Sequence, residues 1–110
     1  METPLDSNET IVKQDGANLQ RGIETVGGWL YLTDRRLIFE PHAINFQRDV
    51  TIIAKDSISG VAKCWTKFLN KIPIANNSLA VRTAQDQEYK FVLSASVRDD
   101  WESAIKPLPV

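Results

Sequence analysis

Apolar and polar residues alternate with the period of a β-strand over most of this chain, most clearly around the polar corner 33–36. Antiparallel pairing of Leu32 with Leu37 puts Leu30 opposite Phe39, and these four side chains then share one face. The alternate positions Trp29, Tyr31, Ile38 and Glu40 occupy the other face. A loop of two or of four residues fits this register. Asp-Arg suits the positive φ angles of a tight primed turn poorly, so the loop length stays open.

Further strands are expected on both sides of this hairpin. Strand-like sequence begins at Ile11, and Gly27-Gly28 is expected to interrupt it before the hairpin. Pro41 is expected to end the hairpin and to open a loop over 41–49. The strands that follow are expected at residues 50–54, 58–65, 79–82 and 89–93.

The period of the pattern changes from that of a strand to that of a helix after Leu93. Ser96 is expected to cap the helix, with Asp99 three residues later as in a capping box. Lys106-Pro107 is expected to end it. The apolar face of this helix comprises Val97, Trp101, Ala104 and Ile105.

This order of elements predicts an α+β, mostly β fold. Six to seven antiparallel strands are followed by one C-terminal α-helix, which must cover an antiparallel sheet or barrel. Residues 1–10 are polar and are expected to form a loosely held tail. Residues 11–106 are expected to form a single domain, and 107–110 a C-terminal tail.

The composition is that of an ordinary soluble globular protein, and the chain is expected to be cytoplasmic, with peripheral membrane attachment as an open alternative. The 110 residues are 43% hydrophobic and 25% charged, with a net charge of −1, which argues against nucleic-acid binding. Cys64 is the one cysteine, so neither an internal disulfide nor a cysteine-based zinc cluster is expected. The polar start of the chain lacks the pattern of a signal peptide, and no apolar run is long enough to cross a bilayer.

The segment 63–74 combines positive charge with large apolar residues. Residues 57–85 contain four basic and no acidic residues, so they carry +4 and the rest of the chain −5 to give −1. Three uses of the segment stay open: contact with a protein partner, contact with an anionic membrane, or a small second core closing one end of the barrel. The candidate contact residues are Lys63, Trp65, Lys67, Phe68, Leu69, Lys71, Ile72 and Ile74.

Candidate catalytic chemistry is sparse. His42 and Cys64 are a distant alternative as a catalytic pair, and His42 has no second metal ligand near it in sequence. Arg21, Arg35 and Arg36 are a weak candidate for anion contact. No phosphate-binding glycine loop and no metal-loop spacing occur, so neither enzymatic activity nor a cofactor is expected.

The string Trp29-Leu-Tyr-Leu-Thr-Asp-Arg-Arg-Leu-Ile-Phe39 resembles the signature hairpin of GRAM domains. Weaker similarities follow in order at residues 52–58, at 79–83 with 89–91, and at 98–101, so that the resemblance covers about residues 10 to 106. It implies a pleckstrin-homology-like (PH-like) barrel or sandwich closed by a C-terminal helix. It also implies docking to lipid headgroups or peptides. Where lipid-binding relatives carry a basic cluster, residues 20–28 contain one basic residue, Arg21.

The leading hypothesis is a non-catalytic module that docks to a protein partner, or to a second copy of itself, through segment 63–74. The alternative is peripheral binding to anionic membrane lipids through the same segment.

Overall fold

The computed structural model describes residues 1, 3–21, 24–42, 50–68 and 72–106; for residues 21, 24, 65–68 and 72–76 it describes the backbone alone. Seven strands and a short 3-10 helix, η2, precede one α-helix. The elements are β1 (Ile11–Arg21), β2 (Glu24–Thr33), β3 (Arg36–Pro41), β4 (Thr51–Ala54), η2 (Lys55–Ser57), β5 (Ile58–Phe68), β6 (Ile72–Thr83), β7 (Glu88–Val92) and α1 (Ala95–Ile105). The predicted fold class is confirmed.

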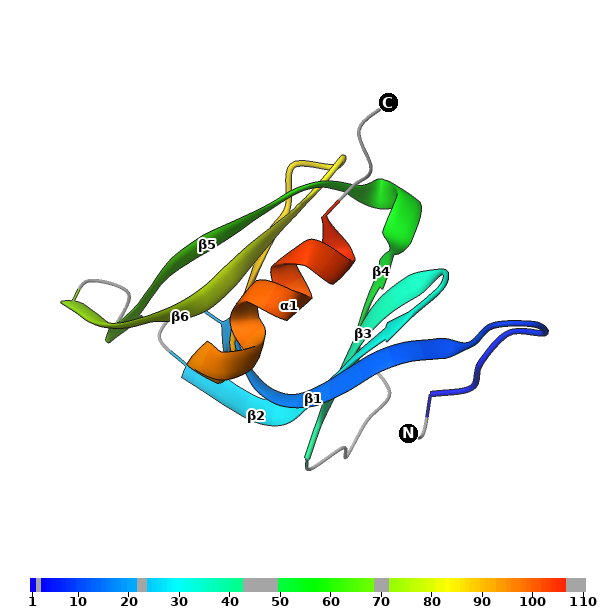
Figure 1. Cartoon of the computed structure of the whole chain (residues 1–110), viewed down its shortest axis with the longest axis horizontal. Helices are drawn as coiled ribbons and strands as arrows, with labels where there is room; N and C mark the ends of the chain where they lie inside the picture. Colours follow the sequence, from blue (N-terminus) through cyan, green and yellow to red (C-terminus); the bar gives the residue numbers. More distant parts are fainter. Residues whose placement is uncertain (2, 22–23, 43–49, 69–71, 107–110) are drawn as a thin grey trace.

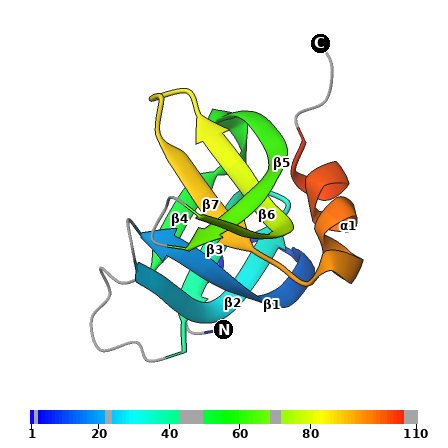
Figure 2. The same cartoon turned by 90° about the vertical axis from the view of Figure 1, so that its left-hand side faces the viewer.

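The strands form one antiparallel sheet in the order β4-β3-β2-β1-β7-β6-β5. β1 lies at its centre and joins the two halves through pairs such as Leu19 with Phe91. The sheet bends so that β1 to β4 and β5 to β7 face each other, and α1 lies along the open side between them (Figures 1 and 2). The end strands β4 and β5 do not pair with each other in the described part of the chain, so the barrel is open.

The β2–β3 hairpin has the register that the alternating pattern predicts. Leu32 pairs with Leu37 and Leu30 with Phe39, and all four side chains are buried. Phe39 reaches the opposite layer, where its ring lies 6.0 Å from that of Phe91. The main core comprises Ala17, Leu19, Leu30, Leu32, Leu37, Phe39, Ile53, Ile58, Leu79, Val81, Phe91, Leu93, Trp101 and Ile105.

A side chain organises the turn of this hairpin. The Thr33 hydroxyl oxygen accepts hydrogen bonds from the backbone N–H groups of Arg35 (3.0 Å) and Arg36 (2.8 Å). Neither Asp34 nor Arg35 has a positive φ, so the primed turn is absent, as the sequence suggests. Threonine instead supplies the acceptor that stabilises the turn.

The apolar face of α1 is also as predicted. Trp101 and Ile105 are fully buried, and Val97 and Ala104 pack partly buried against the core. Among the described residues, no helix combines the length and the apolar character needed to span a membrane.

The predicted break at Gly27-Gly28 is wrong, because β2 passes through both residues without interruption. Gly28 pairs with Pro41, and a Cβ atom on Gly28 would lie 2.2 Å from the Glu40 carbonyl oxygen. The glycine therefore permits a close approach of two strands instead of ending one. The chain reverses between Arg21 and Glu24.

Other boundaries also differ from the sequence prediction. The helix begins at Ala95, and the Ser94 carbonyl, two residues before the predicted cap Ser96, accepts the first helical hydrogen bonds. The hydroxyls of Ser94 and Ser96 bond to each other at 2.9 Å instead of capping backbone N–H groups. Strands β5 and β6 are also longer than predicted, since both extend into segment 63–74. Most of the predicted loop 41–49 and the tail 107–110 lie outside the described residues.

Candidate functional site

β5 is a long edge strand. Its backbone pairs with β6 and with no other strand of the described chain, from Ile58 opposite Thr83 to Phe68 opposite Ile72. In Figure 1 this hairpin extends past α1 as a projecting arm, called here the β5–β6 arm (residues 58–68 and 72–83). An edge strand presents backbone N–H and C=O groups with which another chain can pair.

The described parts of the predicted contact segment, residues 63–68 and 72–74, form the outer part of the β5–β6 arm. Lys63 is the one candidate contact residue whose side chain is described. The side chains of Trp65, Lys67, Phe68, Ile72 and Ile74, and all of Leu69 and Lys71, lie outside the described residues. Their role in docking stays a prediction.

Lys63 joins the β5–β6 arm to the helix. Its Nζ atom lies 3.3 Å from Asp99 Oδ1, and both side chains are exposed to solvent. An exposed ion pair of this kind contributes about 0–1 kcal/mol to stability. Lys63 can therefore exchange Asp99 for another acidic group at little cost to the stability of the fold.

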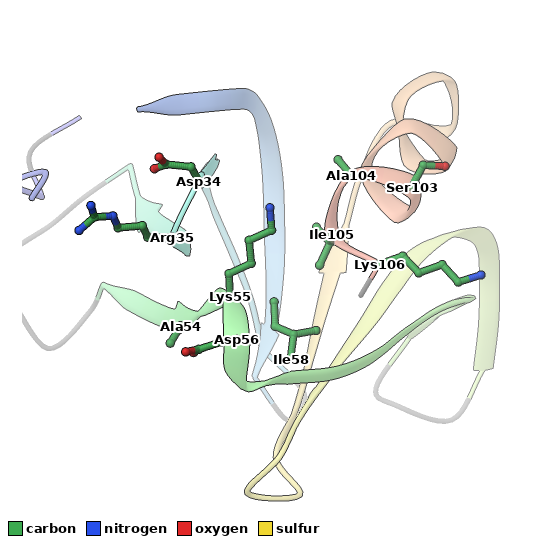
Figure 3. Close-up of a pocket in the computed structure, with 10 residues that line it drawn as sticks. All are labelled: Asp34, Arg35, Ala54, Lys55, Asp56, Ile58, Ser103, Ala104, Ile105 and Lys106. Carbon is green, nitrogen blue, oxygen red and sulfur yellow. The ribbon is translucent and has the colours of Figure 1, made fainter. Parts of the chain in front are cut away.

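A groove of about 750 Å³ opens at the other end of the molecule, between the C-terminal end of α1, the β2–β3 turn and η2. Figure 3 shows Ile58 and Ile105 pointing toward each other at its base, while Lys55 extends into the space between turn and helix. The residues that line it are Asp34, Arg35, Ala54, Lys55, Asp56, Ile58, Ser103, Ala104, Ile105 and Lys106.

The chemistry of this groove suits binding. Its base is apolar, and its rim carries three basic and two acidic side chains, a mixture typical of a site that recognises part of a peptide or a small polar molecule. Sequence reasoning missed the groove because its walls come from residues 34–35, 54–58 and 103–106. No single stretch of sequence contains the pattern.

The two candidate anion-contact arginines whose side chains are described, Arg35 and Arg36, do not converge. The side chain of Arg21 lies outside the described residues, and exposed Arg35 lines the groove. Arg36 instead binds Glu9, with Nε 2.9 Å from Oε2 and a terminal nitrogen 2.7 Å from Oε1. The Thr33 hydroxyl donates to the same carboxylate at 2.6 Å. Sequence reasoning did not find this contact, because Glu9 and Arg36 lie 27 residues apart.

The Glu9 carboxylate is buried and charged. Hydrogen bonds from Arg36, and then from Thr33, lower the pKa of Glu9 from its ordinary 4.5 to about 2. The two residues Thr33 and Arg36 are called the carboxylate clamp below.

Trp29, Tyr31, Ile38 and Glu40 lie on the face of β2 and β3 that points away from the main core, as the register predicts. Tyr31 and Ile38 are nevertheless buried, while 43% of the Trp29 surface is exposed. Burial, and then the negative charge of Glu40, raise the pKa of Tyr31 above its ordinary 10.0. This outer face therefore has a partial cover.

His42 and Cys64 lie in separate elements. His42 follows β3, with its ring 5.9 Å from that of Trp29 in an edge-on arrangement. Cys64 lies in β5, where its backbone is paired with Ser78. The described residues contain no group of three or more His, Cys, Asp or Glu side chains placed to hold a metal ion.

Comparison with solved structures identifies the fold. The N-terminal PH domain of Vps36 superimposes with a TM-score of 0.67 at 18% identity, over 94% of this chain and 80% of the other. The chain has a PH-like fold. The C-terminal domain of an unknown protein from Leishmania infantum superimposes with a TM-score of 0.71 at 20% identity, over 88% of this chain and 81% of that one. At these identities the likeness concerns the fold alone.

A scan against models of known protein families finds no match, and a search of curated proteins finds no significant relative. The PH-like fold that the GRAM resemblance implies is thus confirmed, while the GRAM family itself stays a prediction.

Proposed function

We propose that this PH-like domain is a non-catalytic binding module that docks to a protein partner through the β5–β6 arm. The observation that carries the proposal is the eleven-residue edge strand β5, which pairs with β6 alone among the described strands. A partner strand added along this edge gains main-chain hydrogen bonds without any rearrangement of the sheet.

The residue types of the segment supply specificity for this docking. Lys67 and Lys71 steer association toward an acidic surface, because residues 57–85 contain no acidic residue, and Lys63 can exchange its ion pair with Asp99 for one with the partner. Trp65, Phe68 and Ile72 provide large apolar groups of the kind that anchor interfaces. The expected partner is therefore a protein with an exposed strand or extended segment beside an acidic patch.

Peripheral binding to anionic lipids through the same segment is the second candidate. It rests on the +4 charge of residues 57–85, since each basic residue near an anionic membrane contributes about 1 kcal/mol. Membership of the GRAM family, supported by the hairpin signature at 29–39, belongs to the same proposal.

Amide hydrogen exchange across residues 58–83 separates these possibilities. The chain is measured at low and high protein concentration, and with phosphatidylcholine vesicles with and without phosphatidylserine, at low and high salt. Protection that appears with concentration identifies docking between copies. Protection that requires phosphatidylserine and is lost in high salt favours the membrane alternative.

A photo-crosslinking residue in place of Ala62, which is exposed on β5, tests docking to another protein in a cell extract. The control carries the same photo-crosslinking amino acid in place of Ala84, which is exposed beyond the end of β6. The proposal predicts a discrete adduct at position 62 that Lys63→Glu weakens and Lys55→Glu, an exposed charge reversal in η2, does not. Two results together would contradict the proposal: equal crosslinking at positions 62 and 84, and amide hydrogen exchange in the β5–β6 arm that is the same under every condition.

A further inference from the structure

The outer face of β3 carries a second, independent surface. Arg36, Ile38 and Glu40 alternate with the core residues and point away from the main core. Residues 3–10, called here the N-terminal strap, contact both ends of this row: Thr3 at Glu40, and Pro4 and Glu9 at Arg36. Ile38 lies between the two anchor points, and it is fully buried although it does not belong to the main core. The strap is therefore anchored at both ends of this row, at Arg36 and at Glu40.

The strap is held by polar contacts at its ends. The Thr3 N–H and hydroxyl donate to Glu40 Oε2, and the Pro4 carbonyl accepts from Arg36 at 2.9 Å. The Glu9 carboxylate accepts four hydrogen bonds, from Thr33, from two nitrogens of Arg36 and from the Asp6 backbone at 2.8 Å. Residues 4–8 between the anchors are exposed. The Glu9 carboxylate thus supplies three of the strap's hydrogen bonds to the rest of the chain, and Thr10 adds two with Asp34, both at 3.1 Å.

The backbone of the carboxylate clamp is fixed by the sheet and not by the strap. Thr33 ends β2 and Arg36 begins β3, and the turn between them is stabilised by its own bonds from the Arg35 and Arg36 N–H groups to Thr33. Displacement of the strap leaves the Thr33 hydroxyl in place and releases the Arg36 guanidinium from Glu9 and the Pro4 carbonyl. That pair is complementary to another carboxylate, which an arginine binds through two parallel hydrogen bonds.

The strap covers this face incompletely. Ile52, opposite Ile38 in the β3–β4 pairing, is 49% exposed, and Trp29, opposite Glu40, is 43% exposed. Residues paired directly across two strands point to the same face, so both apolar groups flank the strap. A longer segment that reproduces the strap contacts and also covers Trp29 and Ile52 would bury more apolar surface than the strap does.

We propose that this outer face is a docking surface for an extended acidic segment of a partner protein, and that the N-terminal strap occupies it in cis as a competitor. The partner places an Asp or Glu carboxylate in the clamp of Thr33 and Arg36, and donates a backbone N–H or a hydroxyl to Glu40. Its apolar side chains cover Trp29 and Ile52. Displacement of the strap therefore accompanies binding.

The probe is a synthetic peptide of residues 1–10, titrated into the chain of 110 residues and into its Glu9→Gln variant. Binding is followed by the NMR signals of the Arg36 Nε–H and backbone N–H groups. The variant is expected to bind the peptide about tenfold or more tightly than the wild-type chain, because the cis strap competes at a high effective concentration. A peptide with Gln in place of its Glu9 is expected not to bind, and Arg36→Lys in the variant is expected to abolish binding.

If Glu9→Gln gives no folded spectrum, the wild-type chain with excess peptide tests the same exchange, and a shift of the Glu9 signals to those of a released strap supports the proposal. Three results would overturn it: no change at Arg36 in either chain, equal binding of the Glu and Gln peptides, or concentration-dependent dimers of Glu9→Gln, which would mean that straps exchange between copies.

Discussion

The indole N–H of Trp101, on the C-terminal helix, donates a hydrogen bond of 2.7 Å to Asp15 Oδ2 in the first strand. The Nζ atom of Lys13, on the same strand, lies 5.4 Å from the centre of the Trp101 ring. The ring itself is fully buried. These contacts attach α1 to β1 across 86 residues of sequence and fix the helix along the open side of the sheet.

Asp15→Ala is expected to lower the free energy of unfolding by about 1–3 kcal/mol, because the buried indole N–H loses its acceptor. Asp15→Asn keeps an acceptor oxygen and should cost less. Urea unfolding measures both. Gln14→Ala, at an exposed neighbouring position, is the matched control and should change stability by no more than about 0.5 kcal/mol. Equal stability of Asp15→Ala and wild type would contradict the attachment.

The ion pair of Glu9 predicts a specific dependence on pH. Because the pKa of Glu9 is lowered from 4.5 to about 2 in the folded chain, its charged form favours the folded state. This contribution is fully present above pH 4.5 and is lost as the pH falls toward 2. The difference in unfolding free energy between wild type and Glu9→Gln should therefore be largest near neutral pH and shrink between pH 4.5 and 2. A difference that is independent of pH would show that Glu9 is not charged in the clamp.

Gly28→Ala should destabilise the domain, since the new Cβ would meet the Glu40 carbonyl oxygen at 2.2 Å and Pro41 Cα at 2.8 Å. Backbone atoms cannot rotate away, so β2 and β3 must separate, at a cost of about 1–3 kcal/mol. Thermal unfolding checks this. Gly16→Ala is the control, because a Cβ there meets no atom within 4 Å and should leave the unfolding temperature unchanged or raise it slightly.

The two faces of β3 and β4 should differ in their response to truncation. Phe39→Ala removes a fully buried ring that contacts the opposite layer, and should cost about 3–5 kcal/mol. Ile52→Ala removes a side chain that is half exposed, and should cost less than about 1 kcal/mol. Chemical denaturation of both variants tests the register. A shift of the strands by one residue would exchange the buried and exposed faces, and Ile52→Ala would then cost more than Phe39→Ala.

The strands and the helix could be predicted because each has a short period that a local pattern reveals. The pairing of Leu30 with Phe39 follows from alternation alone, and the buried face of Trp101 and Ile105 follows from helical spacing. The interruption at Gly27-Gly28 was wrong for a physical reason. Glycine marks either a turn or a close approach of backbones, and only the position of Pro41 on the neighbouring strand distinguishes the two.

The sites depend on contacts between distant residues, so the sequence predicted them less well. The clamp requires the pairing of Glu9 with Arg36, and the groove requires Lys55 and Lys106 to lie at one end of the molecule. Neither relationship has a period or a motif. Composition singled out segment 63–74, but the extended backbone of β5 to Phe68 lies beyond the boundary at residue 65 that alternation predicts.

The central position of β1 has a consequence for biosynthesis. Translation delivers β1, β2, β3 and β4 first, and these strands can pair as neighbours while the rest of the chain is still being made. The other edge of β1 stays unpaired until β7 is made, and its inner face stays uncovered until Trp101 is made. Until β7 and α1 have been synthesised and have packed against β1, the nascent chain therefore carries a bare strand edge beside an uncovered apolar face, the combination that chaperones bind. Docking of α1, rather than formation of the first hairpin, ends that exposure.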